Sequence, residues 1–212
     1  MKTVATAPGK IILVGEHAVV YGRPAIAVPV WDVVARAEVT DAGQRPGCYL
    51  VAPQIGLSTR LVNAPDDEPL AVVARLALSE AGLEDPAWQI SITSTIPVAS
   101  GLGSGAADSE ALARAVRNHA GAPADPATIS RIVYAAEELH HGTPSGIDNT
   151  VIAYERPIWF VKGAPIEDFH AGARLTFVIA DSGIAAPTKE TISDVRRGWQ
   201  LYAQRYDCLL YT

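Results

Sequence analysis

The sequence is poor in cysteine, in positive charge and in long apolar runs, and each shortage excludes a class of protein. Two cysteines among 212 residues, Cys48 and Cys208, are too few for a metal cluster or a disulfide scaffold and suit a reducing compartment. The 17 lysines and arginines stand against 23 acidic residues, so there is no basic stripe for nucleic acid or an anionic membrane. No apolar run approaches the ~20 residues that span a bilayer. We therefore expect a cytoplasmic protein with neither kind of partner.

Hydrophobic residues make up 49% of the chain and charged residues 19%, as in globular proteins, and their spacing predicts both strands and helices. Apolar alternation predicts strands at 4–6, 10–14, 25–30, 33–40, 49–52, 89–94, 151–154, 158–161 and 175–180. A turn at Pro8-Gly9 is expected between the first two. Helical spacing predicts helices at 69–81, 104–119, 126–141 and from about Thr188. This order favours an α+β fold in which the strand at 175–180 opens a second domain.

The helix at 126–141 has the clearest boundaries. Asp125 is a favourable N-cap, Pro126 suits the first helical position, and Gly142 stops the helix. Its apolar residues keep one face, which we expect to be buried: Ile129, Ile132, Val133, Ala136 and Leu139. Glu137 lies at the edge of that face, whereas Glu138 points away from it. Only Glu137 is therefore expected to look into the protein.

Residues 97–106 form a glycine-rich turn between a predicted strand and a predicted helix. Three glycines at 101, 103 and 105 expose backbone N–H groups, and the helix start adds a positive dipole end, so the turn suits a phosphate. The spacing is neither that of the P-loop nor that of the dinucleotide turn. A tight strand-to-helix connection, with glycines for steric reasons, is the alternative at this point.

Three segments read together resemble the motifs of the GHMP kinase superfamily. Residues 97–107 are similar to its second motif, whose turn wraps the triphosphate of ATP. Residues 7–22 (APGKIILVGEHAVVYG) are similar, nearly letter for letter, to the first motif as mevalonate kinases carry it, whereas galactokinases depart from it after Gly-Glu-His. Residues 142–149 (GTPSGIDN) resemble the mevalonate kinase segment that carries the catalytic aspartate. The three motifs occur in the same order as in the superfamily, which makes the match specific.

The resemblance implies ATP and Mg²⁺ as ligands. The expected ATP-binding residues are Pro97, Ser100, Gly101, Leu102, Gly103, Ser104, Gly105 and Ala106. Many relatives have at position 105 a serine that helps to hold Mg²⁺; with Gly105 here, Ser104, a water or Glu137 alone must do so. Glu137 and Ser104 are thus the expected metal ligands. Read without the motif, Glu137 is a half-buried glutamate at a helix edge.

Phosphoryl transfer needs a base for the acceptor hydroxyl and positive charge beside it, and the resemblance assigns both. Asp148 is the expected base, and Lys10 would keep it ionised and polarise the hydroxyl. The alternatives are a turn or cap aspartate and an exposed lysine at a strand end. Glu16 and His17 resemble the residues that hold mevalonate, although a lone histidine is usually structural. Asp108 adds negative charge to the first turn of the phosphate helix.

For domain organisation the resemblance implies a GHMP kinase fold. An N-terminal domain like domain 2 of ribosomal protein S5 would span 1–170, and the start of a ferredoxin-like C-terminal domain would span 171–207. Residues 208–212 read like a translated mosaic-end adapter, so a non-native tail is expected; a genuine amphipathic helix end is the alternative. No further glycine-rich motif follows residue 175. We therefore expect the isolated chain to be impaired by truncation and to expose apolar surface along 175–199.

The function expected from the resemblance is ATP-dependent phosphorylation of mevalonate to 5-phosphomevalonate in isoprenoid biosynthesis. Two alternatives stay open: a GHMP kinase for phosphomevalonate, homoserine or a sugar, and a homologue that binds nucleotide without catalysis. Retention of Lys10, Glu137 and Asp148 favours catalysis over the second alternative. A homodimer stays open.

Overall fold

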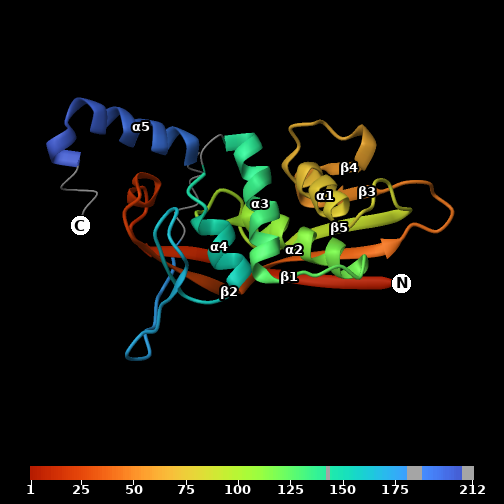
Figure 1. The fold of residues 1–212 in the computed structure, drawn as a ribbon, viewed down its shortest axis with the longest axis horizontal. Helices are drawn as coiled ribbons and strands as arrows, with labels where there is room; N and C mark the ends of the chain where they lie inside the picture. The colour runs from red at the N-terminus through yellow and green to blue at the C-terminus, as the bar shows by residue number, and fades with distance from the viewer. Residues whose placement is uncertain (142–143, 181–187, 207–212) are drawn as a thin grey trace.

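The computed structural model describes residues 1–141, 144–180 and 188–206. It is an α+β fold in which a mixed seven-stranded sheet carries a layer of helices (Figure 1). The strands are β1 (Lys2–Val14), β2 (Ala25–Asp41), β3 (Tyr49–Ala52), β4 (Leu57–Arg60), β5 (Trp88–Ser94), β6 (Ile158–Phe160) and β7 (Glu167–Asp168). The helices are α1 (Pro69–Glu80), α2 (Ser104–His119), α3 (Pro126–His141), α4 (Ile147–Tyr154) and α5 (Thr188–Leu201), with short 3-10 turns at Ala18–Tyr21, Pro53–Ile55 and Leu61–Asn63. The α+β class expected from the sequence is confirmed.

The first two long strands correct the predicted turn at Pro8-Gly9. β1 is one continuous strand, and it pairs with the equally continuous β2 along nearly its whole length. Pro8 pairs with Val34 and Gly9 with Val30, so residues 31–33 of β2 bulge out at this point. Among the described strands β1 pairs with β2 alone, and a proline is tolerated in a strand with a free edge. The Pro-Gly pair therefore produces a register shift in a strand instead of ending it.

β2 is the central strand of the sheet. One side pairs with β1, and the other pairs with β5 over residues 35–41 and with β6 over residues 25–27. β3 lies parallel to β5 and carries β4, and β7 forms the edge beyond β6. Residues 28–34 of β2 pair with neither β5 nor β6. The glycine-rich turn leaves the sheet beside this stretch, where Thr95 donates its backbone N–H to the Val34 carbonyl at 2.9 Å.

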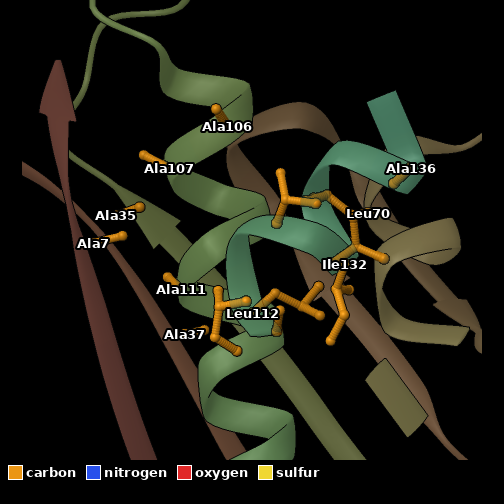
Figure 2. Packing of buried hydrophobic residues seen from close by; sticks show 14 of the residues in the cluster. Ala7, Ala35, Ala37, Leu70, Ala106, Ala107, Ala111, Leu112, Ile132 and Ala136 are labelled. Atoms are coloured by element: carbon orange, nitrogen blue, oxygen red, sulfur yellow. The ribbon is translucent and has the colours of Figure 1, made fainter. Parts of the chain in front are cut away.

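Small side chains bring α2 close to the sheet. Ala107 and Ala111 of α2 face Ala7, Ala35 and Ala37 of the two long strands, and all five are fully buried (Figure 2). Larger side chains fill the space on the far side of α2, where Leu112 meets Leu70 of α1 and Ile132 of α3 (Figure 2). A methyl group at each helix-strand contact allows close approach and leaves little room for sliding. The start of α2 is thereby fixed relative to β1.

Two predicted strands are wrong. Residues 151–154 belong to α4, and Val151, Ile152 and Ala153 are buried on successive sides of it. A short apolar run does not distinguish a buried helix from a buried strand, because neither shows a polar face. Residues 175–180 form no strand, and Leu175, Phe177, Val178 and Ile179 are exposed. No strand within the described ranges pairs with that segment, and an extended chain is not stable without a ladder.

The other helices agree with the sequence, with one local error. α1, α2 and α3 end within one residue of the predicted limits, and α5 begins at Thr188 as expected. The predicted buried face of α3 holds from Ile129 to Ala136, but Leu139 is exposed. The C-terminal end of α3 stands clear of α2 at the top of the molecule (Figure 1), in keeping with the exposure of Leu139.

α5 stands apart from the other helices and returns toward the end of β1 (Figure 1). The ring of Trp199 lies 5.3 Å from that of Tyr21, in the 3-10 turn that follows β1. Among the described helices, none combines the length and the apolar character required to cross a bilayer. The predicted tail at 208–212 lies outside the described residues.

Candidate active site

The glycine-rich turn and the first motif meet at Lys10. The backbone N–H of Lys10 donates to the Leu102 carbonyl at 2.9 Å, which ties β1 to the turn. Lys10 is buried, with 5% of the whole residue exposed, and its side chain runs past Gly103, whose missing Cβ would lie 2.8 Å from the lysine Cγ. Gly103 therefore leaves the space through which the lysine reaches the interior. The alternative of an exposed lysine at a strand end is wrong.

The ammonium group of the Lys10 side chain lies beside the carboxylate of Asp148. Asp148 is in the first turn of α4 and not in a preceding loop. The Lys10 Nζ and an Asp148 carboxylate oxygen are 3.1 Å apart, and the side chains are 6% and 34% exposed. A buried ammonium group requires such a counter-charge. The aspartate keeps an open side, so its carboxylate can contact both the lysine and a molecule in solvent. This is the arrangement that a general base for a bound hydroxyl requires.

Glu137 of α3 is the third charged group of this cluster. Burial raises the pKa of its carboxyl to about 7; the charge of Asp148 raises it further and that of Lys10 opposes the rise. Glu138 is exposed. The predicted orientation of the two glutamates is therefore confirmed, and α3, α4 and β1 bring one cation and two carboxyls together.

The turn itself presents an open, donor-rich side. Gly101 and Gly103 have φ values of 80° and 72°, and Ala99 shares this left-handed conformation at 57°. The Ser100 hydroxyl donates to the Pro97 carbonyl at 2.8 Å and closes the loop. An added Cβ at Gly101 or Gly105 would meet no atom within 4 Å, so both face open space. Within the described part of the chain no side chain caps the start of α2, so its first N–H groups can bind an anion.

The residues predicted to hold Mg²⁺ fit that ion in their chemistry. A carboxyl whose pKa is raised beside a second carboxyl is stabilised in its ionised form by a bound cation. The Ser104 hydroxyl, at the first position of α2, makes no hydrogen bond to a described residue. Within the described ranges no group of three or more His, Cys, Asp or Glu could hold a metal. Mg²⁺ commonly uses one or two carboxylates plus substrate phosphates, so the sparse ligand set suits it.

Glu16 and His17 follow the end of β1 and lead into the 3-10 turn Ala18–Tyr21. Glu16 is exposed and His17 is half-buried with a φ of 64°. Neither side chain makes a hydrogen bond or an ion pair with a described residue. The structure thus shows no hydrogen bond or ion pair between these two side chains and Lys10 or Asp148, and their predicted role in binding the acceptor stays a prediction.

Two further acidic groups lie on α2. Glu110 is fully buried, and neither carboxyl oxygen has a hydrogen-bond partner within the described structure. Burial raises its pKa well above the usual range. Burial also raises the pKa of Asp108 to about 6, opposed by a hydrogen bond with Ser94. Sequence reasoning missed Glu110, although its position three residues after Ala107 places it on the buried face of an alanine-rich helix.

These carboxyls predict that the metal-free protein loses stability as pH rises. Glu110, Glu137 and Asp108 stay protonated in the fold above the pH at which they ionise in the unfolded chain. The unfolded chain therefore binds fewer protons between about pH 4.5 and 7, and the free energy of unfolding falls across that window. Each unit of pKa difference is worth about 1.4 kcal/mol, so we expect a midpoint several degrees lower at pH 8 than at pH 5.5.

Thermal unfolding in EDTA at the two pH values measures this effect. Glu110→Gln keeps the shape of the side chain and removes its charge, so it should flatten the pH dependence. Asp66→Asn, at a fully exposed carboxylate, is the matched control and should leave the dependence unchanged. A parent midpoint that rises from pH 5.5 to pH 8 would contradict the assignment.

With this geometry established, the comparisons with known proteins identify the class. The family model of the GHMP kinases N terminal domain matches residues 69–156, which include the glycine-rich turn, Glu137 and Asp148. This region of the chain is therefore similar to the N-terminal domain of the GHMP kinase superfamily.

Within that superfamily the similarity is to mevalonate kinases. The chain is 33% identical to the mevalonate kinase of Pyrococcus furiosus over 94% of its length, and 32% identical to that of Thermococcus sibiricus over 99%. It spans 63% and 66% of the length of these two relatives. The structure of the L. major mevalonate kinase in complex with R-mevalonate matches 99% of the chain and 64% of that protein with a TM-score of 0.74. At 23% identity this likeness shows the fold alone.

Proposed function

We propose that this chain carries the nucleotide-binding turn and the catalytic aspartate of an ATP-dependent kinase that phosphorylates mevalonate to 5-phosphomevalonate in isoprenoid biosynthesis. The observation that carries the proposal is the 3.1 Å pair of Lys10 and Asp148 beside an open glycine-rich turn. The similarity to two archaeal mevalonate kinases supports mevalonate as the acceptor. The motif at residues 7–22 supports it over a sugar.

The roles of the residues follow from their positions. The turn 97–106 and the free N–H groups of α2 bind the phosphates of ATP. Asp148 accepts the proton of the acceptor hydroxyl, and the ammonium group of Lys10, paired with the aspartate, stabilises the developing negative charge. Glu137 and Ser104 would hold Mg²⁺, which when bound neutralises charge on the phosphates. Glu16 and His17 would contact the acceptor.

Domain limits and cellular context belong to the same proposal. We assign residues 1–170, which contain the whole sheet, to the N-terminal domain, and residues 171–207 to the start of a second domain. The exposed apolar side chains at 175–179 suit a segment that packs against further structure. The chain acts on a small molecule in the cytoplasm.

An acceptor panel tests the proposed function. ADP release is measured on the product of the complete gene with mevalonate, phosphomevalonate, homoserine and galactose, each with ATP and Mg²⁺. We expect kcat/KM for mevalonate to exceed that for each other acceptor by at least about a hundredfold, because a site built for particular hydroxyl groups rejects ligands that lack them. A higher value with homoserine or galactose would assign another acceptor. Binding of a fluorescent ATP analogue without turnover of any acceptor would favour the non-catalytic homologue.

A further inference from the structure

The short loop 144–146 determines where Asp148 lies. α4 begins at Ile147, so the aspartate is the second residue of the helix. On the helix side, the Thr150 hydroxyl donates to the Gly146 carbonyl at 2.6 Å. The buried Asn149 amide donates to the Ser130 hydroxyl at 2.7 Å and so attaches α4 to α3. The C-terminal side of the loop is therefore well fixed.

The middle of the loop is wedged between a helix and a strand. Gly146 is buried with a φ of 84°, and an added Cβ would lie 3.2 Å from the Tyr134 ring and 3.7 Å from the Phe160 ring. Tyr134 belongs to α3 and Phe160 to β6, so both walls are elements of the packed core. A shift of the loop would have to displace one of these rings.

The N-terminal side of the loop is held by one long side chain from another part of the chain. The Lys162 ammonium donates to the Pro144 carbonyl at 2.6 Å. Lys162 is half-buried in a turn closed by the Ala164 N–H and the Val161 carbonyl at 3.0 Å, with Gly163 at a φ of 82°. That turn follows β6, which pairs with the central strand β2. The lysine thus connects the loop to the middle of the sheet.

We propose that Lys162 is a positioning residue for phosphoryl transfer: through the Pro144 carbonyl it holds the loop that presents Asp148 to Lys10. The inference rests on the proposed function, since it assumes that Asp148 is the base. A hydrogen bond from an ammonium group to a carbonyl is charge-assisted and stronger than a neutral one. Since a displacement of about 1 Å of a catalytic group can cost roughly a hundredfold in rate, one such bond can matter.

Kinetics of two Lys162 variants test the proposal on the product of the complete gene. Lys162→Met keeps the length of the side chain and removes the donor, so kcat should fall about 10- to 100-fold while KM for the acceptor and ATP-analogue affinity change less than about threefold. Lys162→Arg restores a donor and should recover most of kcat. Lys2→Met, at an exposed lysine paired with Glu38, is the matched control and should behave as the parent. An unchanged kcat, or a loss confined to KM for the acceptor, would overturn the proposal.

A second readout does not depend on turnover. Hydrogen exchange of the amides at 147–154, measured on the 212-residue chain, should be faster in Lys162→Met than in the parent and in Lys2→Met, because α4 loses a tether. Equal exchange rates in the parent and both variants would contradict the proposal that Lys162 fixes the loop, even if kcat fell. If the parent turned over no acceptor, the proposed function would fail, and this measurement would still decide whether Lys162 fixes the loop.

Discussion

Asp148→Asn should lower kcat by about a thousandfold while leaving ATP binding almost unchanged. The substitution keeps the size of the side chain but removes the group that accepts the hydroxyl proton, and general bases contribute roughly 10²- to 10⁴-fold to rates. It also leaves Lys10, which is 5% exposed, without its counter-charge. ADP release with mevalonate and titration with a fluorescent ATP analogue measure the two quantities separately.

The control for Asp148→Asn is Asp66→Asn. Asp66 is fully exposed and lies 3.7 Å from Arg75, far in sequence from the three motifs, so its loss should change kcat less than twofold. Thermal unfolding of both variants excludes a general loss of structure. If Asp148→Asn kept a tenth or more of parental kcat, the aspartate would not be the base.

Gly103→Ala should weaken binding of an ATP analogue by about 10- to 100-fold and reduce turnover with it. Gly103 has a φ of 72°, where a side chain costs about 1–2 kcal/mol. The new Cβ would also lie 2.8 Å from the Lys10 Cγ. Lys10 is held by its backbone bond to Leu102 and by its ion pair with Asp148, so relief of the clash must move either the phosphate turn or the lysine.

Gly105→Ala in the same turn is the matched control. Gly105 has no positive φ, and an added Cβ there meets nothing within 4 Å. We expect analogue affinity within about threefold of the parent and a gain in stability of about 0.5–1 kcal/mol, because alanine favours the helical conformation. Titration and thermal unfolding measure both variants. Equal affinities for Gly103→Ala and Gly105→Ala would contradict the packing of Lys10 against the turn.

The sequence predicted the parts of the fold that depend on local signals. α3 begins where Asp125 and Pro126 place it, and the Asp125 carboxylate accepts the Thr128 N–H at 3.0 Å as an N-cap does. The segments that carry Lys10 and Asp148 were recognised because each motif is continuous in the chain. Lys10 and Asp148 are 138 residues apart, but this separation did not prevent their recognition. The residues of each motif and the order of the motifs along the chain were sufficient for the resemblance.

The errors and omissions come from interactions that no local pattern records. Pro8 and its glycine have the sequence of a turn, but among the described strands β1 pairs with β2 alone, so the proline fits within a strand. Val151 lies in an apolar run typical of a strand, but the run forms a helix that is buried on successive sides. Glutamate is usually exposed to solvent on a helix, and only the packing of α2 shows that Glu110 is buried. Lys162 follows a three-residue strand, and its contact with Pro144 crosses 18 residues.

The most direct test is transfer of the γ-phosphoryl group itself in a single turnover. The product of the complete gene, in excess over ATP labelled at the γ-phosphate, is mixed with mevalonate and Mg²⁺, and the products are separated. We expect the label in phosphomevalonate with the parent, and label remaining in ATP with Asp148→Asn. Label that stays in ATP with the parent, although the nucleotide is bound, would contradict phosphoryl transfer to mevalonate at the Lys10 and Asp148 site.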